Sequence, residues 1–320
     1  MGTVFCDQKP LPLVIEPGEA TGSGANRESL TYLCLHRREF LRAKILEHGA
    51  LLLRGFPALT AAELSNLVRW FSERKPIDYV GGASPRIKLC DGVYTSTEYA
   101  PHVALPLHNE LSYTYRWPTF LFFCCVTAPE QGGETALGDS RALLRKIDRQ
   151  IVREFKERGV KYERNLSGDA CSNFSWQAAF ETCDKSAVER YCRKGGIDFS
   201  WKADGGLHLI EVRPATARHP VTCDEVWFNQ ADGFHPSALA QSDYDALISK
   251  VSEKDFRLNS YFGDGGSIDL RALAHIREVM RRETVLIRWQ AGDILILDNM
   301  LAAHGRMPFK GARRVLVAMS

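Results

Sequence analysis

The sequence lacks any hydrophobic run long enough to cross a membrane. No segment reaches the roughly 18 uninterrupted apolar residues that a spanning helix requires. The first residues, MGTVFCDQKPLPLV, have neither the basic region nor the apolar stretch of a secretory signal, and Cys6 stands where an N-myristoylation signal requires Ser or Thr. We therefore expect a cytoplasmic protein that does not use a membrane.

A strong excess of charge of one sign is also absent. The chain carries 41 Lys and Arg against 39 Asp and Glu, a formal net charge of +2, and like charges do not gather in blocks. Binding to nucleic acid or to an anionic membrane surface depends on a basic excess, because such binding is largely electrostatic. The sequence thus predicts neither partner.

Paired cysteine motifs are the third absence. The nine cysteines are an odd number, and none stands in a CxxC or zinc-ribbon spacing. Cys124 and Cys125 are adjacent within FLFFCCV, where they fit as small apolar core residues. This pattern argues against a disulfide framework and is typical of a reducing compartment.

The chain does contain the composition of a globular protein, with 45% hydrophobic and 25% charged residues over 320 positions. We find no internal repeat, and we expect a single domain over residues 1–320. The stretch EPGEATGSGAN is rich in Gly and small polar residues, so residues 1 to about 27 are expected to be flexible.

Local patterns predict several strands and helices. A capping box of Thr60 and Glu63 begins one helix, an apolar stripe from Leu143 to Phe155 marks a second, and a third starts near Asp269. Weaker helical patterning covers 174–193, and GGETALGDS (132–140) is interpreted as a turn. Apolar runs predict strands in GALLLRGFP (49–57), TFLFFCCVTA (119–128), EVWFNQ (225–230), TVLIRW (284–289), GDILILD (292–298) and RRVLVAM (313–319).

Polar residues near positions 108 and 304 lie beside strand signals that are far apart in the sequence. A barrel or a double-sheet jelly roll would bring such remote strands together. Periodicity alone does not fix that topology, but strands joined by short turns with a few helices outside them are compatible with it.

The segment LPLHNELSY (105–113) carries the first chemical signal. In an extended strand residues i and i+2 point to the same side about 6.6 Å apart, so His108 and Glu110 could bind one metal ion. Two imidazoles and a carboxylate make the facial arrangement of non-haem Fe(II), although zinc accepts similar ligands. An HxE pair alone is a weak signal, but no other histidine in the chain has an acid two residues on.

His304 is the best candidate for the second imidazole. It follows GDILILD and precedes a strand that starts with Arg313 and Arg314, which could hold the far carboxylate of a metal-bound co-substrate. His208 also has an arginine ten residues on, but Pro214 and Pro220 interrupt that segment. Outside a metal site, His304 beside a glycine would be an ordinary turn or surface histidine.

Three blocks together resemble a known family: LPLHNELSY, APEQGGETALGDSRALL and GDILILDNMLAAHGRMPFKGARRVLVAM. They are similar to the Fe(II)/2-oxoglutarate-dependent oxygenases of the taurine dioxygenase (TauD/TfdA) superfamily. The blocks GALLLRGF, SPRIKLCDGVYTSTEY and RHPVTCDEVWFNQ also resemble the subgroup that hydroxylates amino acids or their derivatives in natural-product pathways, such as syringomycin-type aspartyl hydroxylases.

The resemblance implies a mainly β protein with flanking helices, folded as a double-stranded β-helix (a cupin-like jelly roll). It implies Fe(II) held by His108, Glu110 and His304, with 2-oxoglutarate and O2 as co-substrates. The far carboxylate of 2-oxoglutarate would meet Thr135 and one of the two arginines. Strand alternation groups Arg314 with Leu316 and Ala318, and the family's spacing favours Arg314 over Arg313.

Substrate contacts can only be nominated from the family-like blocks. Arg86 could pair a substrate carboxylate or could equally be an exposed loop arginine, and Arg306, two residues after His304, could face the same pocket. Tyr94, Glu98 and Asn229 are further candidates, and each could equally be a satisfied structural group.

Thr135 could simply begin a strand. A turn explains Asp298 and Asn299 as well as a role in supporting the metal site does.

We therefore expect an enzyme that hydroxylates an unactivated C–H bond of an amino acid or amino acid-derived small molecule, free or bound to a carrier protein. Desaturation or ring closure by the same chemistry is an alternative. A zinc hydrolase would need a general base and has no use for the paired arginines. A non-catalytic barrel that binds a carboxylated ligand would tolerate loss of Glu110. The sequence does not indicate an oligomeric state.

Overall fold

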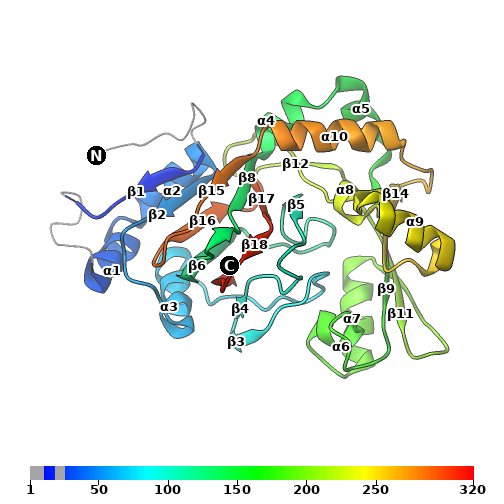
Figure 1. The fold of residues 1–320 in the computed structure, drawn as a ribbon, viewed down its shortest axis with the longest axis horizontal. Coiled ribbons are helices and arrows are strands. Elements are labelled where there is room, and N and C mark those ends of the chain that lie inside the picture. The colour runs from blue at the N-terminus through cyan, green and yellow to red at the C-terminus, as the bar shows by residue number, and fades with distance from the viewer. Residues whose placement is uncertain (1–10, 19–25) are drawn as a thin grey trace.

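Two β-sheets face one another at the centre of the computed structural model, which describes residues 11–18 and 26–320 (Figure 1). Most of the segment expected to be flexible lies outside the described residues. The larger sheet has seven strands in the order β1 (Leu13–Ile15), β2 (Ala50–Leu53), β16 (Ile294–Asp298), β6 (Phe120–Thr127), β19 (Arg314–Met319), β4 (Val93–Thr95) and β3 (Lys88–Cys90). The smaller has four, in the order β15 (Val285–Ile287), β8 (Thr135–Asp139), β17 (Ala302–Arg306) and β5 (Leu105–His108).

Alternation along the central strands divides the core into two layers. Phe123 and Val317 point toward the smaller sheet, where they join a cluster that includes Leu137 and Ala303. Their neighbours in sequence point the other way, against three helices that cover the outer face of the larger sheet: α1 (Arg27–His36), α2 (Arg38–His48) and α3 (Ala61–Ser72). Strands buried on both faces read as continuous apolar runs, which explains FLFFCCV and ILIL.

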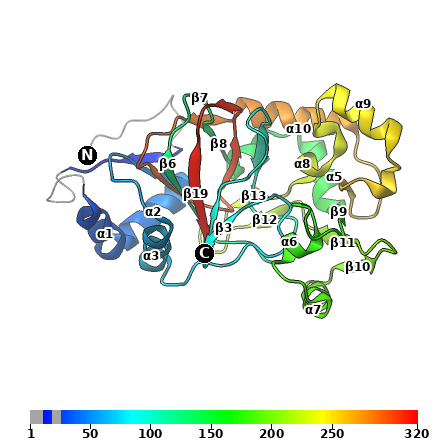
Figure 2. The same cartoon turned by 60° about the horizontal axis from the view of Figure 1, so that its bottom comes forward.

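A second region extends from the sandwich and is seen at the lower right of Figure 1 and again in Figure 2. Its antiparallel sheet has the order β10 (Asp198–Trp201), β11 (Leu207–Arg213), β9 (Val160–Leu166) and β14 (Leu258–Phe262). The helices α6 (Trp176–Phe180) and α7 (Lys185–Gly195) share an apolar cluster with this sheet, which includes Leu166, Val188 and Leu209.

The remaining elements are short strands and helices around these sheets. The strand pairs are β12 (Thr216–Arg218) with β13 (Glu225–Trp227), and β7 (Gln131–Gly132) with β18 (Phe309–Lys310). The helices are α4 (Ser140–Lys146), α5 (Arg149–Arg158), α8 (Ala231–Phe234), α9 (Gln241–Lys250) and α10 (Leu270–Arg282), with 3-10 turns at Pro236–Ala238 and Glu253–Asp255. Within the described chain, no helix combines the length and hydropathy that crossing a membrane requires.

Most elements expected from the sequence are confirmed. The six strand segments correspond to β2, β6, β13, β15, β16 and β19. Helix α3 begins with the Thr60–Glu63 capping box, and α10 begins after Asp269, whose side chain accepts a hydrogen bond from the amide of Arg271. The expected jelly roll, with helices outside two facing sheets, is the observed fold.

Three local expectations are wrong. GGETALGDS contains strand β8 rather than only a turn, because Ala136 and Leu137 are buried between β15 and β17. The stripe from Leu143 to Phe155 forms two helices, since Asp148 caps a new helix after Ile147. The pattern over 174–193 is likewise divided between α6 and α7. His304 does follow β16 and precede β19 as expected, but it lies in a further strand, β17, that the sequence did not indicate.

Candidate metal centre

Three side chains from two distant parts of the chain converge beside the paired strands β5 and β17 of the smaller sheet. One ligand atom from each of His108, Glu110 and His304 lies within 4.8 Å of the others. The imidazole rings of His108 and His304 are 4.3 Å apart between centroids, and His304 Nε2 lies 3.8 Å from Glu110 Oε2. The structure thus brings together the three residues that the sequence nominated as metal ligands.

Strand pairing places the two imidazoles. His304 on β17 is directly opposite His108 on the antiparallel strand β5, so two residues 196 positions apart become neighbours. His108 Nδ1 lies 2.9 Å from the carbonyl oxygen of Pro106. A proton on Nδ1 would bond that carbonyl and leave the lone pair of Nε2 for a metal, as in most metal-bound histidines.

The carboxylate of Glu110 lies beside the two imidazoles, but strand alternation does not place it there. Strand β5 ends at His108, and Glu110 lies in the turn that follows, where Leu111 adopts a φ of 56°. The simple same-side argument for i and i+2 on a strand is therefore wrong for this pair. The turn, and not strand alternation, directs the carboxylate to the imidazoles.

Asn299 fixes that turn from the far end of the sequence. Its Oδ1 accepts a 2.7 Å hydrogen bond from the amide of Glu110, and its Nδ2 donates to the carbonyl oxygen of Glu110 at 2.9 Å and to that of Pro118 at 3.1 Å. The Asn109 side chain donates at 2.7 Å to the carbonyl of Asn299 in return. Asn299 is fully buried, so it supports the metal site and does not merely complete a turn.

Its neighbour Asp298 forms the turn that carries Asn299. Asp298 Oδ1 accepts hydrogen bonds from the amides of Met300 and Leu301, and Oδ2 lies 3.1 Å from His219 Nε2. Both explanations weighed for the Asp-Asn pair therefore apply, one to each residue. Asp298 forms the turn, and Asn299 uses it to hold Glu110.

Arg86 lies against the carboxylate of Glu110. Its Nη2 forms an ion pair with Glu110 Oε2, both side chains are almost completely buried, and the guanidinium lies 4.2 Å from the centroid of the Tyr79 ring. Arg86 Nε and Nη1 are buried and have no hydrogen-bond partner among the described residues. Buried donors of this kind usually have a partner, so the two N–H groups are suited to a ligand oxyanion.

A cavity beside the metal site contains further polar side chains. Thr135 lines it, is buried, and accepts a 3.1 Å hydrogen bond from Trp289 Nε1. Arg313 lines it too and donates from Nε to the carbonyl of Gly133 and from Nη1 to Ser96 Oγ, each at 3.1 Å. Burial lowers the pKa of Arg313 to about 10, with a contribution from the nearby Arg306, so Arg313 is still cationic at neutral pH.

The preference for Arg314 over Arg313 is corrected by this geometry. Arg314 is exposed at the start of β19, whereas Arg313 enters the cavity. The residues of β19 alternate as expected, but Leu316 and Ala318 pack with helices α1 to α3, whereas Val315 and Val317 join the cluster between the two sheets. Alternation shows which residues share a face of a strand. It does not show which of the two faces points toward the smaller sheet.

Arg306 serves a structural purpose that the sequence did not indicate. Its two terminal nitrogens donate to four backbone carbonyls of one loop, at 2.9 to 3.3 Å. Those carbonyls belong to Thr97, Tyr99, Ala100 and Val103. Arg306 also lines the cavity, but with both terminal nitrogens occupied it holds the 97–103 loop rather than offering a fork to a substrate.

The three remaining nominated residues lie in different surroundings. Asn229 is buried and closes a local turn, since Nδ2 donates to the carbonyl of Ala215 and Oδ1 accepts from the amide of Ala231. Glu98 is exposed. Tyr94 lines a neighbouring pocket, where its hydroxyl bonds the carboxylate of Glu181 at 2.6 Å. Of these three, only Tyr94 borders a cavity next to the metal site.

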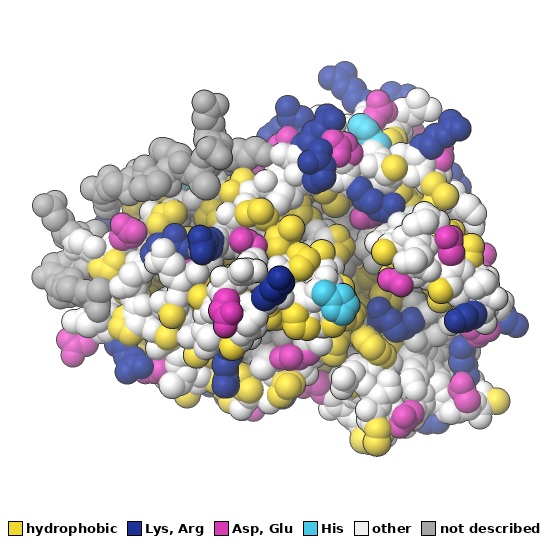
Figure 3. Space-filling model, in the orientation of Figure 1, with side chains coloured by type: hydrophobic (Ala, Val, Ile, Leu, Met, Phe, Trp, Pro, Cys, Tyr) yellow, Lys and Arg dark blue, Asp and Glu magenta, His cyan; other side chains and the backbone are white. Residues whose placement is uncertain are grey.

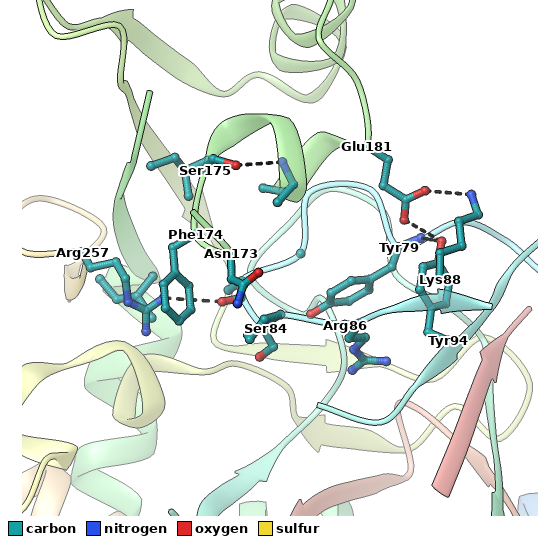
Figure 4. Close-up of a pocket in the computed structure, with 17 residues that line it drawn as sticks. Tyr79, Ser84, Arg86, Lys88, Tyr94, Asn173, Phe174, Ser175, Glu181 and Arg257 are labelled. Atoms are coloured by element: carbon teal, nitrogen blue, oxygen red, sulfur yellow. Dashed lines mark hydrogen bonds and ion pairs between the residues drawn. The ribbon is translucent and has the colours of Figure 1, made fainter. Parts of the chain in front are cut away.

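That neighbouring pocket, here called the substrate pocket, has a volume of about 410 Å³ (Figure 4). Its walls come from the segment 79–88, from 166–181 and from the start of β14. Arg86 lines both this pocket and the cavity at the metal site, so the two spaces share this residue in their walls. Sequence analysis missed most of this lining, because its segments carry no shared motif.

The donor set fits an Fe(II) ion with a chelating co-substrate. Burial lowers the pKa of His304 well below its usual value, and the neighbouring His108 and Arg86 lower it further, so the His304 imidazole is neutral and able to coordinate. His304 Nδ1 is buried without a partner among the described residues. Two imidazoles and one carboxylate on one side leave the opposite side free, as the Fe(II) facial triad requires.

Comparison with known proteins agrees with this chemistry. The model of the family "Taurine catabolism dioxygenase TauD, TfdA family" matches residues 9–319. The dapdiamide synthesis protein DdaC of Enterobacter agglomerans is 37% identical over 85% of this chain and 82% of its own. A clavaminate synthase-like protein of Arabidopsis thaliana is 30% identical over 98% of this chain and 94% of its own.

A solved structure confirms the fold. An asparagine oxygenase, determined with Fe(II), 3-hydroxyasparagine and succinate, superimposes with a TM-score of 0.56 at 12% identity, covering 96% of this chain and 92% of its own. At that identity the likeness concerns the arrangement of the chain. It agrees with the jelly roll described above.

Proposed function

Because the chain belongs to the TauD, TfdA family and is an Fe(II)/2-oxoglutarate-dependent dioxygenase, we propose that it hydroxylates a small amino acid or amino acid-derived molecule at the centre formed by His108, Glu110 and His304. The convergence of these three side chains within 4.8 Å is the observation that carries the proposal. DdaC, by its name, serves dapdiamide synthesis, and that name supports a biosynthetic role here.

Iron and 2-oxoglutarate, when bound, supply the oxidising chemistry: O2 is consumed, one oxygen atom enters the succinate formed with CO2, and the other enters the substrate C–H bond as a hydroxyl group. The residues of this chain hold and orient the reactants. Thr135 and Arg313 would bind the far carboxylate of 2-oxoglutarate, because a half-buried cation with a neighbouring hydroxyl matches a carboxylate. Arg314 has no part in this assignment.

Arg86 would bind a carboxylate of the substrate. Its two unpartnered N–H groups lie where the substrate pocket meets the metal cavity. An acid bound there would place its neighbouring carbons near the iron, and positioning of this kind is the main contribution of the protein to such a reaction. Desaturation or ring closure requires only another placement of the same substrate carbon.

We further propose a single catalytic domain acting in the cytoplasm, on a substrate that is either free or bound to a carrier protein. No disulfide joins any of the eight cysteines within the described chain, in agreement with a reducing compartment. On the face seen in Figure 3, acidic and basic side chains are interspersed, as expected of an enzyme whose partner is a small molecule and not nucleic acid.

Anaerobic titration of the apoprotein with Fe(II) and 2-oxoglutarate tests the metal centre. We expect the weak visible charge-transfer band of the chelate in the wild type and in His102→Ala, whose histidine is exposed and outside the cluster. His304→Ala should not form the band or produce succinate from O2. Tight zinc binding without a band in the wild type would instead favour a hydrolase or a ligand-binding barrel.

A further inference from the structure

The substrate pocket contains three cationic side chains, which have different partners. Arg86 pairs with Glu110, and Lys88 pairs with Asp78 and Glu181 at 2.7 and 2.8 Å. Arg257 alone among these three has no carboxylate within ion-pair distance in the part of the chain that the structure describes. Its charge is therefore not neutralised locally.

Arg257 lies apart from Arg86 and comes from another wall of the pocket. Figure 4 shows it beside Phe174 at the left, with Arg86 below Tyr79 and the Lys88–Glu181 pair at the right. Arg86 lines the metal cavity as well as the substrate pocket, whereas Arg257 lines only the pocket. Arg257 thus marks the part of the pocket farther from the metal.

The guanidinium of Arg257 is held in place, but its hydrogen bonds are weak. It stacks on Phe174 with 4.5 Å between its central carbon and the ring centroid. Its two hydrogen bonds, to the carbonyl of Ala83 and to the hydroxyl of Tyr99, are both 3.4 Å long. A stacked guanidinium with long bonds to neutral groups can take a better acceptor without breaking an ion pair.

An oxyanion is the ligand that this arrangement suits. A planar guanidinium presents parallel N–H donors that match two oxygens of a carboxylate or phosphate, and charge-assisted bonds of this kind are about twice as strong as neutral ones. The pocket lining between these two charges is mixed: Ser84 and Asn173 lie between Arg257 and Arg86 in Figure 4, and Ala83, Pro85 and Leu258 add apolar surface to the pocket. It would accommodate a carbon chain between two charged ends.

We propose that Arg257 and Phe174 form an oxyanion subsite that binds a second carboxylate or a phosphate of the substrate, at the end remote from the oxidised carbon. This inference rests on the proposed function, because it takes the pocket beside the metal centre to be the substrate pocket. The subsite then selects substrates that carry an anionic group at each end. A substrate with a single carboxylate, bound at Arg86, would leave the subsite at Arg257 without an anionic group.

Ligand pairs that differ in the far charge test the subsite. The anaerobic Fe(II)–2-oxoglutarate form is titrated with aspartate, glutamate and 2-aminoadipate against asparagine and glutamine, and with O-phosphoserine against serine. Binding is read from the change in the charge-transfer band. The protein is the wild type, Arg257→Met, Arg257→Lys, or Arg271→Met as a control, since Arg271 is exposed on α10 and outside the pocket.

We expect at least one anionic probe to bind roughly tenfold or more tightly than its neutral match in the wild type and in Arg271→Met. The ratio of the affinities for the anionic and the neutral probe should fall toward one in Arg257→Met and remain partly raised in Arg257→Lys. The affinity for 2-oxoglutarate should stay unchanged in both variants. Preference for the carboxylate or for the phosphate series identifies the group that the subsite takes.

Two outcomes would overturn the proposal. One is a chelate band with no preference for any anionic probe, and the other is a preference that Arg257→Met leaves intact. In both cases the metal chemistry would still stand. Failure of the wild type to form the chelate band would instead refute the proposed function, and the subsite with it, so the two failures are distinguishable.

Discussion

At the scale of single residues, Asn299 is the side chain whose loss should affect the metal most without touching it. Asn299→Ala removes the three hydrogen bonds that hold the backbone of Glu110 and Pro118. We expect metal affinity to fall roughly tenfold or more, the usual effect of removing a group that orients a ligand. Stability should fall by about 2 kcal/mol because buried backbone groups lose their partners.

Asn229→Ala is the matched control, since Asn229 is also buried and also bonds two backbone groups. It should lower stability without weakening binding of Mn(II), measured by competition with a chromophoric chelator. Equal losses of metal affinity in the two variants would show that Asn299 acts only through global stability.

The adjacent arginines give a second prediction at this scale. Arg313→Ala should weaken 2-oxoglutarate binding by roughly 30-fold, because a buried charge-assisted contact contributes about 2 kcal/mol or more. Arg314→Ala should change the affinity little, since Arg314 is exposed. The dissociation constants come from anaerobic titration of the chelate band. A larger effect from Arg314→Ala would restore the assignment made from sequence spacing.

At the scale of elements, the close approach of β5 and β17 sets the separation of the two histidines. A Cβ added at Gly305 would lie 2.5 Å from the carbonyl oxygen of Leu105 and 3.1 Å from that of Pro106. Backbone at that distance has to move, so Gly305→Ala should separate the strands beside His108 and His304. We expect a loss of about 2 kcal/mol in unfolding free energy and weaker metal binding.

Gly233→Ala provides the comparison, because its new Cβ would meet the ring of Pro106 at an ordinary 3.8 Å. Unfolding in urea and Mn(II) affinity should both stay close to wild type in that variant. If Gly305→Ala also bound Mn(II) normally, strand separation would not control the geometry of the metal site.

At the scale of the whole molecule, the metal centre and its cavity are built from segments between residues 86 and 313. These segments are neighbours only in the folded chain. The unfolded chain therefore has no such site, and ligand binding should stabilise the fold. Mn(II) with 2-oxoglutarate at about 100 times its dissociation constant should add about 2.7 kcal/mol. Calorimetry should show a melting temperature several degrees higher.

The same ligands should not shift the melting temperature of His304→Ala. His102→Ala should respond as the wild type does, since His102 is exposed and outside the cluster. A shift retained in His304→Ala would mean that the ions bind elsewhere.

The amino-acid sequence by itself determined the chemistry of this protein. HNE, the later HGR and the paired arginines, in blocks like those of a known family, predicted the three candidate metal ligands and indicated 2-oxoglutarate as the co-substrate. Apolar runs gave the central strands, because a strand buried on both faces has to be hydrophobic throughout. Local capping gave α3 and α10, because the cap and its partner are neighbours in sequence.

Only the tertiary structure decided which side chains face the site. Arg313 and Arg314 are adjacent and chemically identical, and the choice between them depends on which face of β19 meets the smaller sheet. Asn299, Arg306 and Arg257 act through contacts that span 158 to 209 positions, and no local pattern encodes such contacts. Sequence fixes the kinds of groups available, and packing fixes where each of them points.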